Sequence, residues 1–377
     1  MKRLFLLTLS AAFFASCGHN SKKSGDLVSY LTDDNLPPLQ QIEFEKVDLP
    51  EDVSIASENF VYHDSILISQ QDNRAFPHNI WFTNLNSGET IGKFLRSGRG
   101  PGEVLSCYPR LLQNRLICFD PGKTQLIVFD IDSVVAKGEA YKPKMMEVDT
   151  DVDEFDILSD TSLVFQNCYH LAGCGNPANE NIPELLVAGK DGKTGFKLPE
   201  GAYHVSNSSH KRVVTNIKKD RVVMVYGYKP QFTILDTKFD TIKIIYGPDK
   251  LEKVKYRMIF NNELLPEAGQ KRSYTNSVVT TENYLLVNVT RGKENSYPLP
   301  FEMDENQYVD AINQYNANPE NHPEIFKFDW DGNLIVRYKQ SPESYRVVAL
   351  TGYSEDSNTL YALLVENGEW ILHKAKL

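Results

Sequence analysis

The stretch Ile325-Phe326-Lys327-Phe328, followed shortly by Asp331-Gly332, shows the pattern that decides the fold. Its short apolar or alternating run is typical of a β-strand. Asp-Gly then favours the tight turn of a hairpin, because glycine accepts a positive φ. The stretch therefore predicts two neighbouring antiparallel strands.

The same unit, a short run, a turn and a second run, occurs about six times along the chain. The runs lie at 80–82, 126–130, 185–187, 232–235, 325–328 and 360–364, and their turns lie near Ser87, Ser133, Gly192, Lys238, Gly332 and Gly368. Most turn centres are about 40 to 60 residues apart, with one long insertion. This spacing predicts the blades of a β-propeller.

Further strands are predicted between these hairpins, at 55–68, 111–119, 155–165, 213–226, 278–289 and 347–350. We therefore predict an all-β protein, a six-bladed β-propeller of four-stranded antiparallel blades, with one domain over residues 40–377. The last predicted blade is one strand short. Residues 40–49 read as a strand without another partner, with apolar side chains at Ile42, Phe44 and Val47 between polar ones. We expect this N-terminal strand to close the ring, because closure removes exposed sheet edges.

Two short helical inserts are predicted in the long gap. Residues 249–258 place Leu251, Val254 and Met258 on one face after an aspartate cap. Residues 304–315 repeat the pattern before Pro319. We expect both inserts to project from one rim, where they either bind a partner or pack over a blade end.

The N-terminus carries an export signal over residues 1–16, in which Lys2 and Arg3 precede an apolar run. The sequence Ala15-Ser16-Cys17 resembles a bacterial lipobox, and this resemblance implies lipidation of Cys17; plain secretion is the alternative. Residues 17–39 are rich in polar residues and proline and predict a flexible tether. We expect an exported, lipid-anchored protein of the cell envelope, at the outer membrane and facing the periplasm or the exterior.

Composition excludes several classes of protein. The 377 residues are 41% hydrophobic and 24% charged, which is enough for a large core. Lys and Arg number 40 against 50 Asp and Glu, a net charge of -10 without a long basic run, so nucleic acid and anionic membrane surfaces are poor partners. Beyond the leader, no apolar stretch reaches the roughly 18 residues of a membrane-spanning helix.

The four cysteines after Cys17 lie in two groups of two along the sequence. Cys168 and Cys174 flank His170, so a disulfide-closed loop, free thiols and a partial zinc site are all open, although zinc needs three or four ligands. Cys107 and Cys118 flank a strand-like run and are predicted to be buried, unpaired thiols. We predict no metal and no cofactor.

The segment from Phe94 to Val104, with the later Tyr108-Pro109 and the run from Gln125 to Asp130, resembles the NHL repeat, a propeller blade motif. Together with the lipobox it is similar to the six-bladed, TolB-like propeller lipoproteins of Bacteroidota. The resemblance implies the fold and the envelope location. NHL propellers include binding scaffolds and metal-dependent lyases, but the metal ligands of the lyases match no positions here.

Three further motifs favour structural roles. Gly98, Gly100, Pro101, Gly102 and Glu103 lack the helix of a phosphate-binding loop, so we interpret them as a turn between blades in which Glu103 satisfies backbone donors. The acidic run at Asp149, Asp151, Asp153, Glu154 and Asp156 lacks the glycine of an EF-hand and predicts a solvated linker. His204 and His210 lie near serines without a nucleophile-elbow motif.

The candidate binding residues lie in or beside the long insert and combine amphipathic aromatic side chains with arginine and histidine. They are Arg291, Tyr297, Tyr308, Tyr315 and His322. We predict a monomeric binding or protein-interaction module whose partner is an envelope protein or a glycan. The alternative is an envelope hydrolase or lyase with its active site at the mouth of the propeller channel, and no catalytic residue is assigned.

Overall fold

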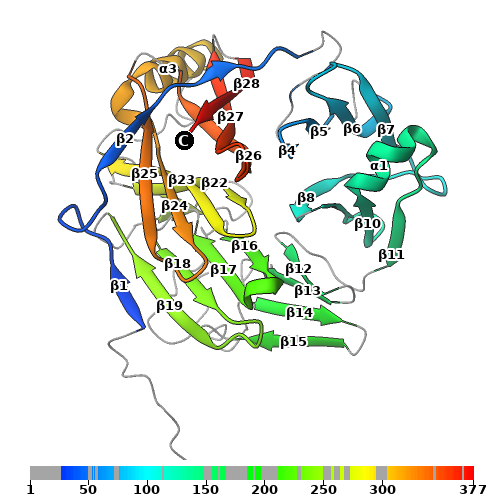
Figure 1. Ribbon diagram of the computed structural model, residues 1–377, viewed down its shortest axis with the longest axis horizontal. Helices are drawn as coiled ribbons and strands as arrows, with labels where there is room; N and C mark the ends of the chain where they lie inside the picture. Colours follow the sequence, from blue (N-terminus) through cyan, green and yellow to red (C-terminus); the bar gives the residue numbers. More distant parts are fainter. Residues whose placement is uncertain are drawn as a thin grey trace, which may run out of the picture.

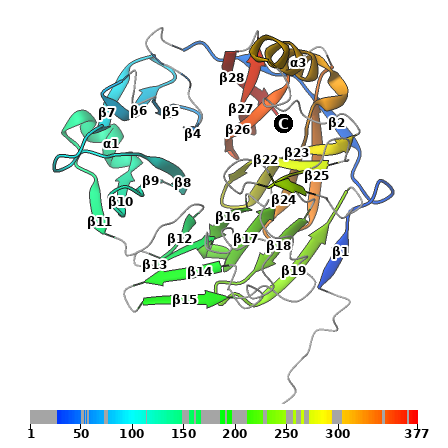
Figure 2. The same ribbon diagram turned by 180° about the vertical axis from the view of Figure 1, so that it is seen from behind.

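The computed structural model describes residues 27–49, 53, 55, 58–71, 76–112, 114–147, 155–159, 162–166, 185–189, 192–196, 211–226, 231–248, 256–258, 264–266, 272–293, 304–342, 345–366 and 369–377. These residues form an all-β β-propeller with antiparallel blades and few helices, in which the sheets are arranged around a centre (Figures 1 and 2).

Six sheets of four or five strands make up the described part of the propeller. The first sheet contains β4 (Asn59–Tyr62), β5 (Ile66–Gln70), β6 (His78–Asn84) and β7 (Thr90–Arg96), and the second contains β8 (Tyr108–Leu112), β9 (Arg115–Asp120), β10 (Gln125–Asp130) and β11 (Lys144–Glu147). The third contains β12 (Phe155–Ser159), β13 (Ser162–Gln166), β14 (Leu185–Gly189) and β15 (Gly192–Phe196).

The other three sheets each add a strand from the N-terminal segment. The fourth contains β16 (Lys211–Asn216), β17 (Arg221–Tyr226), β18 (Gln231–Leu235), β19 (Thr241–Tyr246) and β1 (Val28–Tyr30). The fifth contains β22 (Arg272–Thr280), β23 (Tyr284–Lys293), β24 (Glu324–Asp329), β25 (Leu334–Gln340) and β2 (Leu39–Ile42). The sixth contains β26 (Val347–Ser354), β27 (Thr359–Glu366), β28 (Glu369–Lys376) and β3 (Glu45–Lys46).

Five of the six predicted hairpins are confirmed. They are β6–β7, β14–β15, β18–β19, β24–β25 and β27–β28. The tight turn predicted at Asp132-Ser133 is wrong, because α1 (Ile131–Lys137) begins there and the return strand is β11. Asp130 caps this helix by accepting a hydrogen bond from the Ser133 amide at 2.8 Å, so these polar residues begin a helix here.

The helical inserts differ from each other. The predicted helix at 304–315 is confirmed as α3 (Glu305–Ala317), whose Asp304 forms a capping box with Gln307. In the other insert, Tyr256–Met258 is a strand, β20, paired with β21 (Leu264–Pro266), so the helix predicted there is wrong at these residues. Residues 249–255 lie outside the described residues.

Hydrophobic clusters join each sheet to the next. Ile68, Phe82 and Phe129 belong to the cluster between the first and second sheets. Comparable clusters lie between the second and third, third and fourth, fourth and fifth, and fifth and sixth sheets. A further cluster, with Val61 and Leu363, joins the sixth sheet to the first. Because each sheet buries apolar side chains against two neighbours, burial stabilises their arrangement around the centre.

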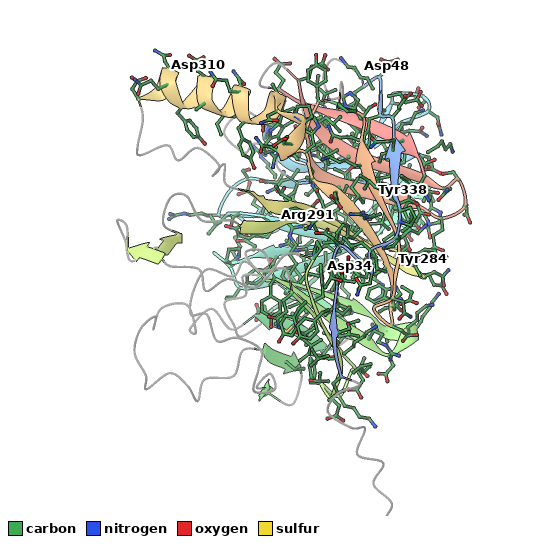
Figure 3. All side chains as sticks on the ribbon, turned by 90° about the vertical axis from the view of Figure 1, so that its left-hand side faces the viewer. Asp34, Asp48, Tyr284, Arg291, Asp310 and Tyr338 are labelled. Atoms are coloured by element: carbon green, nitrogen blue, oxygen red, sulfur yellow. The ribbon has the colours of Figure 1, made fainter. Side chains whose placement is uncertain are left out.

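The N-terminal segment follows the outer edges of three consecutive sheets (Figure 3). Strands β1 and β2 pair in parallel with β19 and β25, and β3 pairs antiparallel with β28. The Val47 amide also donates to the Leu372 carbonyl at 2.9 Å. Residues 28–30 are therefore paired although the sequence assigns them to the tether, and Glu45–Lys46 supply an outer strand to the sixth sheet.

The contact between the sixth and first sheets depends on Gly352 in β26. A Cβ atom at this position would lie 2.6 Å from the Val61 carbonyl oxygen and 3.0 Å from the Val61 Cβ atom. A larger residue would push β26 away from β4, because backbone atoms cannot move aside as a flexible side chain can.

We predict that Gly352→Ala lowers the free energy of unfolding by about 2–3 kcal/mol, measured by urea denaturation. Gly102→Ala is the comparison variant, because a Cβ atom there meets nothing within 4 Å and only the φ of 77° opposes it. That variant should lose about 1 kcal/mol. A Gly352→Ala protein as stable as the wild type would contradict the close packing of these two sheets.

Candidate functional site

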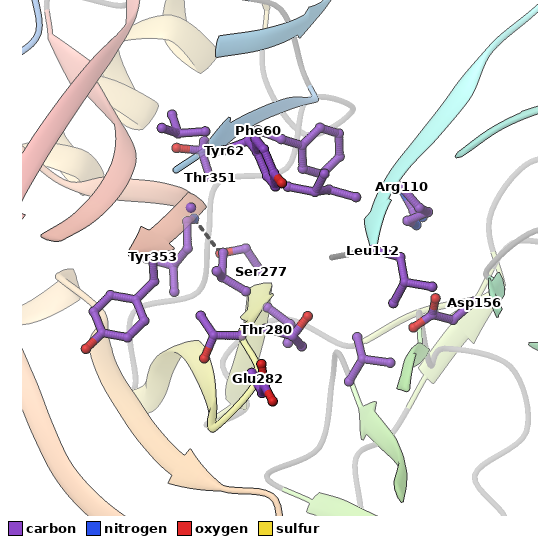
Figure 4. Close-up of a pocket in the computed structure, with 18 of the residues that line it drawn as sticks. Phe60, Tyr62, Arg110, Leu112, Asp156, Ser277, Thr280, Glu282, Thr351 and Tyr353 are labelled. Carbon is purple, nitrogen blue, oxygen red and sulfur yellow. Dashed lines mark hydrogen bonds between the residues drawn. The ribbon is translucent and has the colours of Figure 1, made fainter. Parts of the chain in front are cut away.

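A cavity of about 670 Å³ lies at the centre of the propeller (Figure 4). Residues of β4, β8, β12, β16, β22 and β26 line it, so each of the six sheets contributes its inner strand. The turns that follow β4, β16, β22 and β26 also reach it, through His63, Lys218, Glu282 and Glu355. Such a volume is in the range of small-molecule binding sites. We call this cavity the channel.

Asp156 on β12 is a buried carboxyl group in the channel wall, with 8% of its surface exposed. It accepts hydrogen bonds from the amide of Ile157 at 2.7 Å and from the amide of Thr215 at 2.6 Å. Burial raises the pKa of Asp156 to about 7, while these hydrogen bonds and the positive charge of Arg110 oppose the rise. Asp156 can therefore hold or release a proton near neutral pH.

This placement corrects the prediction for the acidic run. Asp156 does not belong to a solvated linker, because it lies in a strand and its side chain faces a neighbouring sheet. Asp149, Asp151, Asp153 and Glu154 lie outside the described residues. The alternation of charged residues suggested exposure, but the period of two also places every second residue of an inner strand toward the channel.

Hydroxyl groups lie elsewhere in the channel wall. Thr351 on β26 is 3% exposed, and its Oγ1 atom has no hydrogen-bond partner among the described residues. Ser277 on β22 accepts a hydrogen bond from the Leu350 amide at 2.7 Å, drawn as a dashed line in Figure 4. The Thr351 Oγ1 atom is itself enclosed, so this hydroxyl lies behind the surface that a ligand in the channel would meet.

Apolar side chains complete the wall. Phe60 and Tyr62 on β4 lie on one side of the open space, and Leu112 on β8 lies near Asp156 on another (Figure 4). The Tyr62 hydroxyl donates to Asp132 at 3.3 Å. Burial and the charge of Asp132 raise the pKa of Tyr62 to about 12, so this phenol stays protonated.

Polar contacts between sheets surround the end of the channel where the turns lie. Lys218 lies 3.2 Å from Glu282, and Glu355 accepts hydrogen bonds from the backbone and side-chain nitrogens of Asn283 at 2.8 and 2.7 Å. The Lys327 ammonium group donates to the Tyr353 hydroxyl at 2.6 Å. These contacts tie the fourth, fifth and sixth sheets together around the opening.

The glycine-rich segment lies in the turn between β7 and β8, away from the channel lining. The Glu103 carboxylate accepts a hydrogen bond from the Gly100 amide at 2.7 Å, and the Lys123 ammonium donates to the Gly100 and Glu103 carbonyls at 2.9 and 2.6 Å. Gly98 and Gly102 have φ of 153° and 77°. Pro101 lies between them at the exposed tip.

The four described candidate binding residues of the long insert do not line the channel. Arg291 on β23 forms an ion pair with Asp33 at 2.9 Å, and Tyr308 on α3 is half-buried. Tyr315, on α3, and His322, which follows it, are 8% and 4% exposed, so both are buried rather than on an open surface. Tyr297 lies outside the described residues.

A polar network holds α3 against the fifth sheet. The two ring nitrogens of His322 contact the Asn316 carbonyl at 3.1 Å and Gln340 Nε2 at 3.0 Å. The Arg346 guanidinium lies 5.2 Å from the centre of the Tyr315 ring. Tyr315 and His322 therefore take part in the packing of the insert, which is one of the two alternatives for this segment.

Of the cysteines, Cys107 and Cys118 are buried and unpaired, as predicted. Cys17, Cys168 and Cys174 lie outside the described residues, as do His204 and His210. Among the residues that the structure describes, no three His, Cys, Asp or Glu side chains are grouped to hold a metal ion. No helix in this part of the chain is long and apolar enough to cross a membrane.

The buried His322 predicts a pH effect on stability. Burial lowers its pKa to about 4, and the charges of Lys339 and Arg346 act in the same direction. In the unfolded chain His322 has an ordinary pKa of about 6.5, so it binds a proton at a higher pH than in the folded chain. The stability that the neutral, buried imidazole contributes is therefore complete above about pH 6.5 and is lost as the pH falls from about 6.5 to 4.

The wild type should lose unfolding free energy when the pH is lowered from about 7.5 to about 5. We expect this loss to be smaller in His322→Asn, by about 1–2 kcal/mol. Urea denaturation at the two pH values measures this difference. His63→Asn, which replaces an exposed histidine, is the control and should leave the pH dependence unchanged. The same pH dependence in wild type and His322→Asn would rule out a neutral, buried imidazole.

Comparisons with known proteins show the fold and no more. No protein-family model matches the chain, and no curated protein matches its sequence. A solved structure of a DUF4221 family member from Bacteroides vulgatus is similar, with a TM-score of 0.55 and 9% identity over 90% of this chain and 99% of that one.

Two further solved structures have lower TM-scores. A Bacteroides fragilis protein described as a "putative exported protein" has a TM-score of 0.45 and 10% identity, over 93% of this chain and 99% of that one. A streptogramin B lyase has a TM-score of 0.43 and 10% identity, over 88% of this chain and 97% of that one. The architecture and the central channel together define the chain as a β-propeller protein.

Proposed function

We propose that the chain is a lipid-anchored, exported binding module of the cell envelope, and that it binds a small molecule in the channel of a closed, six-bladed propeller. The observation that carries the proposal is the channel itself, a preformed cavity to which the inner strands of all six sheets contribute. Its wall combines apolar side chains with a few buried polar groups, the composition of a small-molecule site.

Several features support the ring on which this site depends. Six hydrophobic clusters link six sheets, and the cluster around Val61 and Leu363 links the last sheet to the first. The pairing of β3 with β28 supports closure by the N-terminal strand. The Ala15-Ser16-Cys17 sequence supports the lipid anchor at Cys17. The envelope partner in this proposal is the small ligand or a glycan that carries it, bound by a single copy of the chain.

A variant that fills the channel tests the binding proposal. Thr280 on β22 is half-buried and lines the channel, so a tryptophan there would occupy space that a ligand needs. The full chain, purified in detergent, is incubated with the small-molecule extract of the cells that produce it. Compounds that stay bound after rapid desalting are identified by mass spectrometry.

We expect the wild type to retain one or a few compounds and Thr280→Trp to retain none of them. The control is Val135→Trp, which adds the same side chain on the exposed surface of α1 and should retain the wild-type set. Retention of the same compounds by Thr280→Trp, or no retention by the wild type, would contradict binding in the channel.

The pKa of Asp156, raised to about 7, favours one second candidate, an envelope hydrolase or lyase that uses this carboxyl group for proton transfer. The same incubation separates the two functions. An enzyme would convert compounds of the extract, with loss of conversion in Thr280→Trp, whereas a binding module would return its bound compounds chemically unchanged.

A further inference from the structure

We propose that the propeller lies with its rim toward the membrane, so that the outer edge of the fourth sheet meets the lipid and the Tyr30 side chain enters the headgroup region. The channel axis then runs parallel to the membrane plane. This inference rests on the lipid anchor at Cys17 that is part of the proposed function, and it adds the orientation of the propeller and the surface that contacts the lipid.

The N-terminal segment is firmly attached to the outer edge of the fourth sheet. The Ile244 amide donates to the Leu27 carbonyl, and the Leu31 amide donates to the Tyr246 carbonyl, both at 2.7 Å. These bonds flank the parallel pairing of β1 with β19. Strand β1 lies at the rim of the propeller (Figure 1). A lipid anchor at Cys17 would therefore hold the propeller by this part of its rim.

The length of chain between the lipid and this rim is short compared with the propeller. Ten peptide units connect Cys17 to Leu27 and span at most about 36 Å. A folded domain of about 350 residues has a radius of gyration of about 20 Å, as in a sphere about 50 Å across. Figures 1 and 2 place α1 and β1 on opposite sides of the ring. The tether cannot reach across the propeller, so the rim at α1 cannot rest on the membrane.

The end of the channel where the turns lie is acidic. Glu282, Glu355 and Asp356 line this end, and Lys218 is the basic group that pairs with Glu282 at 3.2 Å. The phosphate groups of lipid headgroups repel carboxylates. This end of the channel is therefore a poor surface for the membrane.

The other end of the channel is also unfavourable. Strand β23 runs away from the turn that joins it to β22, so α3, which follows β23, lies at this second end. The sequence of α3 contains Asp310 and no basic residue, and Asp304 caps it. Both aspartates are exposed. The rim at β1 is thus favoured over either end of the channel.

Tyr30 on β1 gives this rim an aromatic side chain of the kind found at lipid interfaces. Its exposed fraction of 63% is the largest among the exposed large hydrophobic residues that the structure describes, and its ring stacks on Tyr246 with the centres 5.5 Å apart. Tyrosine is enriched at the level of the headgroups, because it combines an apolar ring with a polar hydroxyl. Of the two acidic residues that follow, Asp33 pairs with Arg291 at 2.9 Å, and Asp34 lies further along the segment toward β2.

This orientation has a consequence for the channel. The six sheets surround the channel, so a propeller with its rim on the membrane has neither end of the channel against the lipid. A ligand then reaches the channel from the aqueous side without crossing the membrane.

Fluorescence quenching on vesicles tests the orientation. The full chain, lipidated in the cells that produce it, is reconstituted into phosphatidylcholine vesicles with or without bromine on the acyl chains close to the headgroups. Bromine quenches a tryptophan only at short range. The test variant is Tyr30→Trp, and each variant is compared with the wild type, which carries three tryptophans.

Three matched variants add a tryptophan on the other sides of the propeller. They are Val135→Trp on α1 at the opposite rim, Ile217→Trp in the turn after β16, and Val309→Trp on α3. All four positions are 44–63% exposed, so each variant should fold, which circular dichroism checks. We expect brominated lipid to remove about half of the emission added by Tyr30→Trp and to leave that added by the other three unchanged.

Quenching of any of the other three variants in place of Tyr30→Trp would show that another side of the propeller faces the lipid. Quenching of none would show that the tether holds the propeller away from the membrane. Either result overturns the inference. Sedimentation of the vesicles separates these failures from a failure of the proposed function. If the wild type does not sediment with the vesicles, the lipid anchor itself is wrong and the inference fails with it, whereas retention of compounds in the channel is measured independently.

Discussion

Among the described strands, the inner strand of each sheet has no strand partner on its channel side, so its amides and carbonyls there bond to side chains or to water. Side chains of the neighbouring sheet meet this requirement at two places. The Thr215 amide of β16 donates to Asp156 of β12, and the Leu350 amide of β26 donates to Ser277 of β22. The rest of the site depends on these contacts, because they hold the inner strands at fixed positions around the channel.

A rigid wall explains how structural and binding roles meet in one residue. Asp156 is buried where it joins two sheets, the same burial raises its pKa to about 7, and the residue also lines the channel. The hydrophobic clusters between sheets oppose any widening of the cavity, and Gly352 lets β26 approach β4 closely. A preformed cavity of this kind reduces the entropy that a ligand or protein must lose on binding.

The blades were predictable from the sequence because hairpins are local: Asp331-Gly332 and the runs beside it carry the signal within a few residues. The helix α3 was predictable for the same reason, since Asp304 and Gln307 form its cap. The channel was not predictable, because its residues come from six strands far apart in the sequence. The alternation around Asp156 suggested exposure to solvent, and only the neighbouring sheets reveal its burial.

Two of the candidate binding residues, Tyr315 and His322, are buried within the chain's own packing. Tyr315 and His322 share the composition of a binding surface, but both are buried and their partners are Arg346, Asn316 and Gln340. Composition alone does not distinguish a residue that anchors a partner from one that anchors an insert of its own chain. The deciding property is exposure, which depends on where the helix packs.

Residue-resolved amide hydrogen exchange under native conditions tests the central claim, that contacts between sheets hold the inner strands rigidly around a preformed channel. The account predicts that the Thr215 and Leu350 amides exchange only through global unfolding, with an opening free energy equal to the unfolding free energy of the domain. Exchange of these two amides as fast as that of exposed turn amides would show that the inner strands open locally, and would contradict a rigid channel.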